Sequence, residues 1–267
     1  MSTYIALVKM RFINGLQYRT AALAGIATQF GFGFMFISQY LAFYRTNPTA
    51  FPMEIHQVVS YIWIQQAFLA LFMTWFFENE IFSAITSGGI SYDLARPFDL
   101  YSKWYCQCAA SRLSRAMLRC MPIIVIAAFL PYPYKLLLPP DIIQFVYFLL
   151  SSMLALAVVV AFGMLVYISV FYTMSSVGVR IIGAVLADFF AGSIVPLPFF
   201  PDRLKQIVQV LPFAAMQNMP LRIYSGNISG IEALKGLLFQ LSWLVILLYF
   251  GKLWMSKTLK RVIIQGG

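Results

Sequence analysis

The sequence predicts an all-α integral membrane protein with six transmembrane helices. Of its 267 residues, 61% are hydrophobic and only 10% are charged, whereas a soluble domain carries about 25% charged residues. Apolar runs recur along the chain, and most are close to the roughly 20 residues that cross the hydrocarbon core of a bilayer. Polar and proline-rich segments separate these runs, as surface loops do. We therefore expect a single transmembrane domain over residues 1–267.

The N-terminal third predicts one surface helix and two spans. Residues 1–18 place apolar side chains at helical spacing, with Lys9 and Arg11 on other faces. This pattern is typical of a helix lying in the membrane interface. Residues 21–43 form the first expected span. Residues 57–77 form the second, which ends in three aromatic side chains suited to the water boundary.

A third helix is expected to begin near Trp104 and to leave the membrane near Leu130. Its inner portion carries a basic stripe formed by Arg112, Arg115 and Arg119. Two interpretations stay open for these side chains. They reach towards lipid phosphate groups, or they contact a partner subunit.

The C-terminal half predicts three further spans and a broken hairpin. The uncharged run 142–179 exceeds the bilayer thickness and predicts a single span that is tilted or projects into water. The fifth span is expected over 177–196 and the sixth over 231–255. Between them, residues 196–230 contain five prolines, so this segment cannot cross straight through. It predicts a short amphipathic helix and a re-entrant hairpin.

The distribution of basic residues orients this topology. Most Lys and Arg residues fall on the side that holds both termini and residues 78–104, and by the positive-inside rule that side is cytoplasmic. The hairpin 196–230 is then extracellular. Membrane topology also accounts for the net charge of +10, so we expect no nucleic-acid partner.

The most polar long segment is 78–104, which predicts a structured aqueous loop. Its charges and the breakers Gly88 and Gly89 cannot lie in hydrocarbon. Apolar residues recur within it, so a short amphipathic helix, a break and a second helix from Ser91 or Asp93 are expected. Such an element presents a charged, partly apolar face to the solution.

No catalytic or metal-binding motif is present. The sequence lacks the phosphate-binding G-x-x-x-x-G-K-[ST] motif, the zinc motif H-E-x-x-H and the nucleophile motif G-x-S-x-G, and it contains one histidine. We expect no catalytic residue, metal or cofactor on this chain. Function should then lie in passage through the membrane, or in signalling across it.

Polar residues within the expected spans are candidates for a translocation path: Gln29, Gln65, Gln66 and Asp188. The glutamines have an alternative role as hydrogen-bonding partners between helices. Asp188 is the more informative, because a carboxylate at the centre of a span costs about 2.5–3.5 kcal/mol on insertion scales.

Two stretches resemble a known family. They are ITSGGISYDLARPFDLYSKW, residues 85–104, and LADFFAGSIVPLPFFPDRLKQIVQVLPFAAMQNMPLRIYSG, residues 186–226. Together with the six-span pattern they are similar to type-2 ABC exporter permeases. The resemblance implies a permease subunit in the lipid bilayer of a bacterial cell membrane. It also implies a separate ATP-binding subunit, which holds ATP and Mg, and a second permease subunit, identical or related.

The resemblance further implies a coupling helix in the loop after the second span, where the ATP-binding subunit docks. The implied coupling residues are Ile85, Gly88, Gly89, Ile90, Asp93, Leu94, Arg96 and Pro97. In this family the first and fifth spans typically meet across the dimer. The small residues in the first and fifth expected spans of this chain agree with that arrangement. Those expected at the dimer interface are Gly25, Gly183, Ala187 and Ala191.

The cargo of such an exporter is expected to be hydrophobic or amphipathic. An ion- or proton-coupled secondary carrier using Asp188 is the alternative, and a purely structural membrane scaffold is a third. ATP dependence separates the first two, because the exporter needs an ATPase subunit and the carrier needs a gradient.

Overall fold

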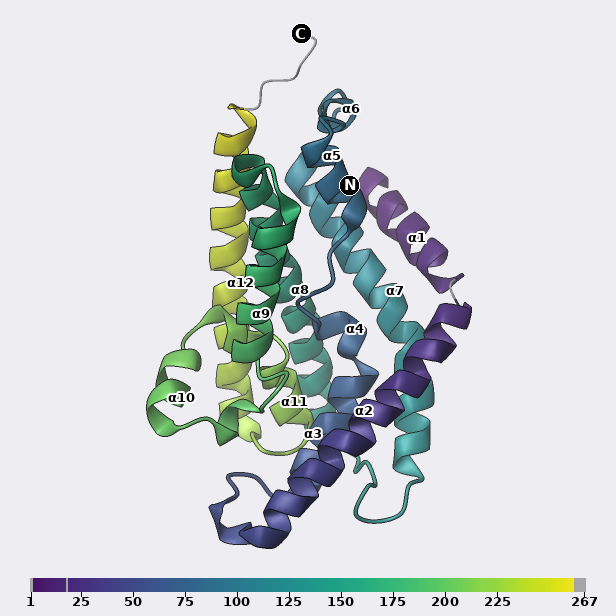
Figure 1. Ribbon diagram of the computed structural model, residues 1–267, viewed down its shortest axis with the longest axis vertical. Helices are drawn as coiled ribbons and strands as arrows, with labels where there is room; N and C mark the ends of the chain where they lie inside the picture. The colour runs from purple at the N-terminus through teal and green to yellow at the C-terminus, as the bar shows by residue number, and fades with distance from the viewer. Residues whose placement is uncertain (1, 18, 262–267) are drawn as a thin grey trace.

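The computed structural model describes residues 2–17 and 19–261, and these residues form an all-helical bundle (Figure 1). The twelve α-helices are α1 (Ser2–Leu16), α2 (Arg19–Thr46), α3 (Ile55–Ala67), α4 (Leu69–Phe72), α5 (Asn79–Thr86), α6 (Ile90–Leu94), α7 (Leu100–Ala128), α8 (Ile142–Thr173), α9 (Ser176–Phe190), α10 (Asp202–Val208), α11 (Asn218–Tyr224) and α12 (Gly230–Leu259). Three short 3-10 helices join them: η1 (Pro48–Ala50), η2 (Leu197–Phe199) and η3 (Pro212–Ala215).

Within residues 2–17 and 19–261, three helices are long and apolar enough to cross a membrane, which indicates a membrane protein. They are α2 from Ala22 onward with 25 residues, α8 with 32 and α12 with 30. The single long helix predicted in the run 142–179 is thus confirmed as α8. Many large apolar side chains on the outer faces of these helices are exposed, as lipid-facing residues are.

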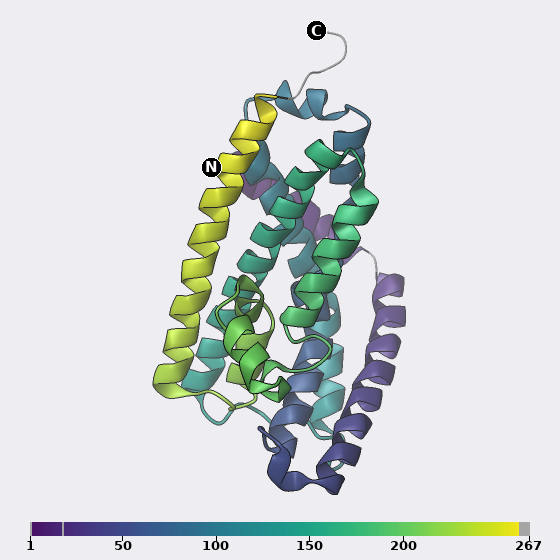
Figure 2. The ribbon, with the colours of Figure 1, turned by 60° about the vertical axis from the view of Figure 1, so that its left-hand side comes forward.

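The ends of the bundle differ in what they carry. The start of α1, the α5–α6 pair and the end of α12 lie at one end, the upper end of Figures 1 and 2. The α2–α3 turn and the loop after α7 lie at the other, and α10 lies towards it. The described termini and the polar segment therefore share one end of the molecule, as the basic residues predict.

The second expected span, 57–77, is not one continuous helix. α3 ends at Ala67, Phe68 leaves the helical region of backbone space, and α4 adds only Leu69–Phe72 before residues 73–78 run extended towards α5. The break is tolerated because the segment lies in the interior of the bundle. Tyr61 and Trp63, for example, are fully buried. Irregular backbone at membrane depth is stable where protein covers it.

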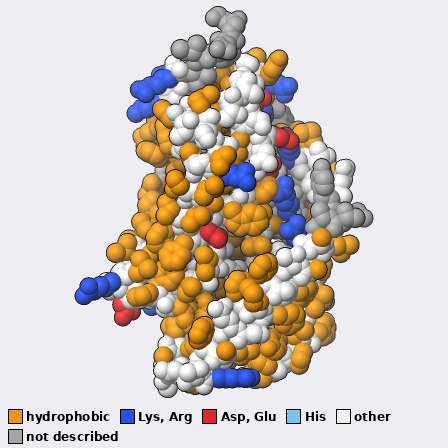
Figure 3. Space-filling view, viewed as in Figure 1, with side chains coloured by type: hydrophobic (Ala, Val, Ile, Leu, Met, Phe, Trp, Pro, Cys, Tyr) orange, Lys and Arg blue, Asp and Glu red, His pale blue; other side chains and the backbone are white. Residues whose placement is uncertain are grey.

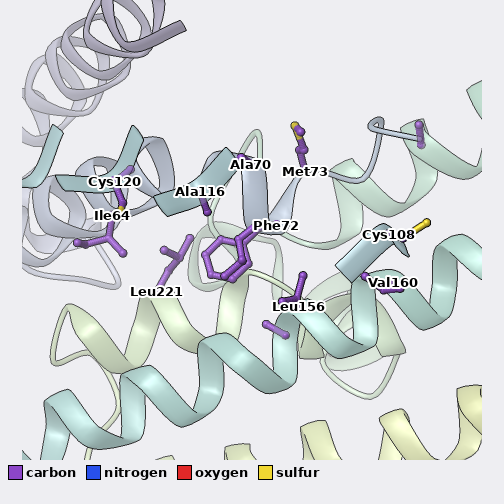
Figure 4. Packing of buried hydrophobic residues seen from close by; sticks show 14 of the residues in the cluster. Ile64, Ala70, Phe72, Met73, Cys108, Ala116, Cys120, Leu156, Val160 and Leu221 are labelled. Carbon is purple, nitrogen blue, oxygen red and sulfur yellow. The ribbon is translucent and has the colours of Figure 1, made fainter. Parts of the chain in front are cut away.

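The core forms where the α3–α4 segment meets α7, α8 and α11. Figure 4 shows Ile64 beside Cys120 of α7, and Phe72 beside Leu221 of α11. Leu156 of α8 lies nearby in the same view. Because this core surrounds the α3–α4 segment, the broken helix is held from several sides.

The fifth helix is shorter than expected, and the proline-rich segment after it has the broken form that its sequence predicts. α9 ends at Phe190 rather than near residue 196, and Gly192 then turns the chain with a φ of +83°. Residues 196–230 fold as η2, α10, η3 and α11. Gln144 of α8 holds this region, because its Nε2 donates to the carbonyl oxygens of Ile223 and Ile228, both at 2.6 Å.

Candidate functional site

The helix–break–helix predicted for the polar loop is confirmed, and residues 78–99 are called the α5–α6 element below. α5 ends at Thr86, and α6 begins at Ile90, one residue before the earliest expected start. Gly88 has a φ of +76°, a conformation that favours glycine. Gly89 has an ordinary φ of −61°. The sharp bend therefore requires glycine at Gly88, whereas Gly89 adopts a backbone conformation open to any residue.

The apolar face of the α5–α6 element points into the chain itself. Ile85 is 4% exposed and Ile90 is 2% exposed. We expected both side chains to contact a partner, and the structure corrects this: they hold the element on its own bundle. Helical periodicity identifies which residues share a face, but it does not identify what covers that face. Leu94 differs, with 37% of its surface exposed.

An aromatic cluster anchors the base of the element to α7 and α8. The rings of Phe82 and Tyr167 lie 4.8 Å apart, and that of Phe77 lies 5.7 Å from Tyr167. Trp104 of α7 lies 6.3 Å from the same Tyr167 ring. The backbone N–H of Glu78 donates to the Tyr167 hydroxyl at 2.6 Å. The base of α5 is therefore packed directly against α7 and α8.

Charged groups tie the second half of the element to α7. Lys103 Nζ lies 2.5 Å from Asp93 Oδ1. Asp99 caps α7 by accepting from the backbone N–H of Ser102 at 2.8 Å, so α7 begins at Leu100, four residues before the expected start. Asp93 is thus engaged within the chain, and its expected role in fixing a partner's register stays a prediction.

The outer tip of the element stays accessible. Tyr92 is 80% exposed, and Arg96 and Pro97 are exposed beside it. With Leu94, these residues form the surface that the element offers to the solution, and it is called the tip surface below. Tyr92 was not among the predicted residues. Its sequence signal was that of an aromatic residue within a polar loop, which could have marked it as a candidate contact residue.

The N-terminal helix is fixed to this element. Arg11 of α1 forms an ion pair with Glu80 at 2.7 Å, and the hydrogen bond from Arg11 lowers the pKa of Glu80. The backbone N–H of Asp99 donates to the Tyr4 hydroxyl at 3.1 Å. A Cβ on Gly15 would lie 2.1 Å from Ser114 Oγ, so α1 packs against α7 at very short range. α1 therefore rests on the bundle rather than extending away from it.

Two of the small residues expected at a dimer interface lie inside the chain. Ala187 and Ala191 are fully buried in a cluster that includes residues of α8 and η3. A Cβ on Gly183 would lie 3.0 Å from the Val166 side chain, and one on Gly25 would lie 2.8 Å from Arg119 Cζ. The expected dimer role is therefore corrected for Ala187 and Ala191, and it stays a prediction for the half-buried Gly25 and Gly183. Small residues allow close approach of a helix, but they do not specify whether that helix is in the same chain.

Two of the four candidate path residues make hydrogen bonds near α9, and the other two are buried on α3 and α2. Gln65 Nε2 donates to the Ser193 carbonyl at 2.8 Å, and Asp188 Oδ1 accepts from Thr74 Oγ1 at 3.5 Å. Both contacts lie where residues 55–74 meet α9 and the turn that follows it. Gln66 is buried in α3, and Gln29 is buried on α2. Among the described residues the Gln29 amide has no hydrogen-bond partner.

Arg112 of the predicted basic stripe has a structural role that the sequence did not identify. Its guanidinium is buried and donates to the carbonyl oxygens of Met73 at 2.6 Å and Phe76 at 2.7 Å. These carbonyls belong to the extended stretch after α4, where no helix satisfies them. Arg112 therefore neither reaches lipid nor contacts a partner. It satisfies the backbone carbonyl groups that are left without helical partners where the second expected span breaks.

In comparisons with known proteins, no family model, curated protein or solved structure matches the chain. Within residues 2–17 and 19–261, no group of three or more His, Cys, Asp or Glu side chains could hold a metal ion. The site is therefore defined by the α5–α6 element and the helices that hold it.

Proposed function

We propose that the chain is the permease subunit of an ATP-driven exporter. It moves a hydrophobic or amphipathic molecule out of the cytoplasm through the cell membrane of a bacterium. α2, the α3–α4 segment, α7, α8, α9 and α12 act as six spans, and both termini face the cytoplasm. A separate subunit binds and hydrolyses ATP with Mg, and a second permease subunit, identical or related, completes the transporter.

One observation carries this proposal: the α5–α6 element has an exposed tip and a firmly held base. The tip surface includes Tyr92, Leu94 and Arg96, while Ile85 and Ile90 are buried beneath it. Close-packed protein interiors transmit strain rather than absorb it. A push on the tip surface therefore reaches α8 through Phe82 and Tyr167. A flexible loop could not transmit force in this way.

The chemistry of the tip surface suits a protein partner. Tyr and Arg are enriched among the residues that dominate binding energy at interfaces, because each combines a large contact area with hydrogen bonding. Arg96 provides a planar donor for a carboxylate on the partner. The basic residues at this end favour the cytoplasmic side, where an ATP-binding subunit is found.

The double variant Tyr92→Ala/Arg96→Ala tests the proposal. Both side chains are exposed, so the fold should persist, while association with the ATP-binding subunit should weaken about tenfold or more. Co-purification of the ATPase with the tagged permease measures this directly. Phe129→Ala/Arg45→Ala is the matched control, because it removes an exposed aromatic and an exposed Arg at the opposite end. Equal ATPase recovery with both double variants would contradict docking at the tip surface.

A further inference from the structure

A small cavity of about 10 Å³ lies where the stretch after α4 meets α7 and α8. This volume is enough for one water molecule. Apolar side chains such as Val160 form part of its wall, and four polar or ionisable residues form the rest: Glu78, Cys108, Arg112 and Tyr167. Figure 4 shows Cys108 of α7 close to Val160 of α8. Cavities of this size stay dry when they are lined by apolar groups alone, whereas this one is polar and therefore suited to water.

Two opposite charges border this cavity, and within residues 2–17 and 19–261 no direct ion pair joins them. Glu78 Oε1 is buried and has no hydrogen-bond partner in this part of the chain. Arg112 is 4% exposed, and two of its five N–H donors bond the carbonyls of Met73 and Phe76. Its other donors are left for a further partner. A buried carboxylate oxygen without any partner is costly, so a group that donates to Glu78 Oε1 is required here.

The contacts of Glu78 place it against this cavity. Its backbone N–H donates to the Tyr167 hydroxyl at 2.6 Å, and its charge acts on Arg112, Cys108 and Tyr167, all three of which line the cavity. Glu78 also borders a larger cavity that opens to the surface beside Trp75, which is 51% exposed. Figure 3 shows charged side chains that solvent reaches, gathered at the upper right of the molecule towards α1. The buried Oε1 atom is closed to that solvent.

Glycine at position 163 leaves room for the cavity. Gly163 lies in the interior of α8, where glycine lowers helix stability relative to alanine. Among the described residues, a Cβ at this position would meet only Phe77 Cε1, at 4.0 Å. Alanine would therefore fit without a clash, and its methyl group would take up space that the cavity now provides. Packing of the neighbouring side chains does not require glycine here, whereas a filled cavity does.

We propose that the cavity binds one ordered water molecule that bridges Glu78 and Arg112. The water accepts from an Arg112 N–H and donates to Glu78 Oε1, and the Tyr167 hydroxyl is its third neighbour. Arg112 would repel a cation and Glu78 would repel an anion, whereas water donates and accepts at the same time. The bridge ties the start of the α5–α6 element to α7 through two opposite charges. This proposal does not depend on docking at the tip surface.

A crystal structure of the full-length chain, at a resolution that shows ordered water, tests the proposal directly. In wild type, density for one water should lie within hydrogen-bonding distance of both Glu78 Oε1 and the Arg112 guanidinium. In Gly163→Ala this density should be absent, because the methyl group takes its place. A cavity without density in wild type, a water that contacts only one of the two charged groups, or a direct ion pair between Glu78 and Arg112 would overturn the proposal.

Thermal unfolding of Gly163→Ala in detergent separates a bound water from a simple packing void. Filling a void and removing a helix glycine should raise the unfolding temperature. Displacing a bridging water leaves both charged groups without their partner, so we expect the unfolding temperature to fall by about 2–4 °C or more. Gly31→Ala in the interior of α2 is the matched control, because its Cβ would meet no described atom within 4 Å, and it should unfold at the wild-type temperature or above. An unchanged or raised unfolding temperature for Gly163→Ala would refute the bound water.

A double-mutant cycle tests whether Glu78 holds the water. Glu78→Ala removes the acceptor, so Gly163→Ala should lower the unfolding temperature less in that background than in wild type. Glu80→Ala is the matched background, because this neighbouring carboxylate pairs with Arg11 instead, and Gly163→Ala should lower the unfolding temperature there as much as in wild type. The same loss in all three backgrounds would show that Glu78 does not bind the water and would contradict the bridge.

Discussion

At the scale of single residues, three arginines of α7 carry most of the unexpected information. Arg112, Arg115 and Arg119 were expected to act as one basic stripe, yet each has different surroundings. Arg112 bonds two backbone carbonyls, Arg115 stacks on Phe76, and Arg119 lies against Gly25. Helical spacing placed them on one side of α7. It could not reveal that the neighbouring segment would break and leave carbonyl groups for Arg112 to satisfy.

Arg112→Ala should therefore destabilise the protein strongly. It leaves two carbonyl oxygens unsatisfied at the end of the broken segment, and each such buried group costs about 1–3 kcal/mol. Thermal unfolding in detergent measures the effect, with Arg180→Ala as a control at an exposed position whose bond to Asn79 is long, at 3.3 Å. If both variants unfold at the wild-type temperature, Arg112 does not hold the broken segment together.

At the scale of elements, the sequence predicted the type of most elements better than their surroundings. The surface helix, the helix–break–helix in the polar loop, the single long helix in the uncharged run and the broken proline-rich segment were all predicted from periodicity and helix breakers. The break after Ala67 was not, because no Gly or Pro marks it and only tertiary contacts stabilise it. The buried faces of α5 and α9 were likewise assigned to partners. Their patterns do not distinguish a partner's surface from the chain's own core.

Ala187→Leu tests the corrected role of α9. Ala187 is fully buried against the chain's own core, so a larger side chain should overpack it and cost about 1–3 kcal/mol. The unfolding temperature of the isolated subunit should fall, whereas Val185→Leu, at a position 62% exposed on the outer side of α9, should leave it unchanged. Normal subunit stability combined with lost self-association in Ala187→Leu would restore the dimer role that the sequence predicted.

At the scale of the whole molecule, the two ends of the bundle are chemically different. The end with the start of α1, the α5–α6 element and the end of α12 carries most of the basic residues, while the opposite end carries the proline-rich segment. The sequence predicted this separation because charge and helix breakers alternate with apolar runs. The positive-inside rule predicts that the basic end faces the cytoplasm. The proposed docking of an ATP-binding subunit requires this orientation.

Labelling of single cysteines from outside the cell tests this central claim most directly. In a background with Cys106, Cys108 and Cys120 replaced, Ser87→Cys reports the α5–α6 element and Ser229→Cys the opposite end; both positions are exposed. A membrane-impermeant maleimide added to intact cells should label position 229 and should reach position 87 only after the cells are permeabilised. Labelling of position 87 in intact cells would place the α5–α6 element outside, where no ATP-binding subunit could dock, and would contradict the proposed function.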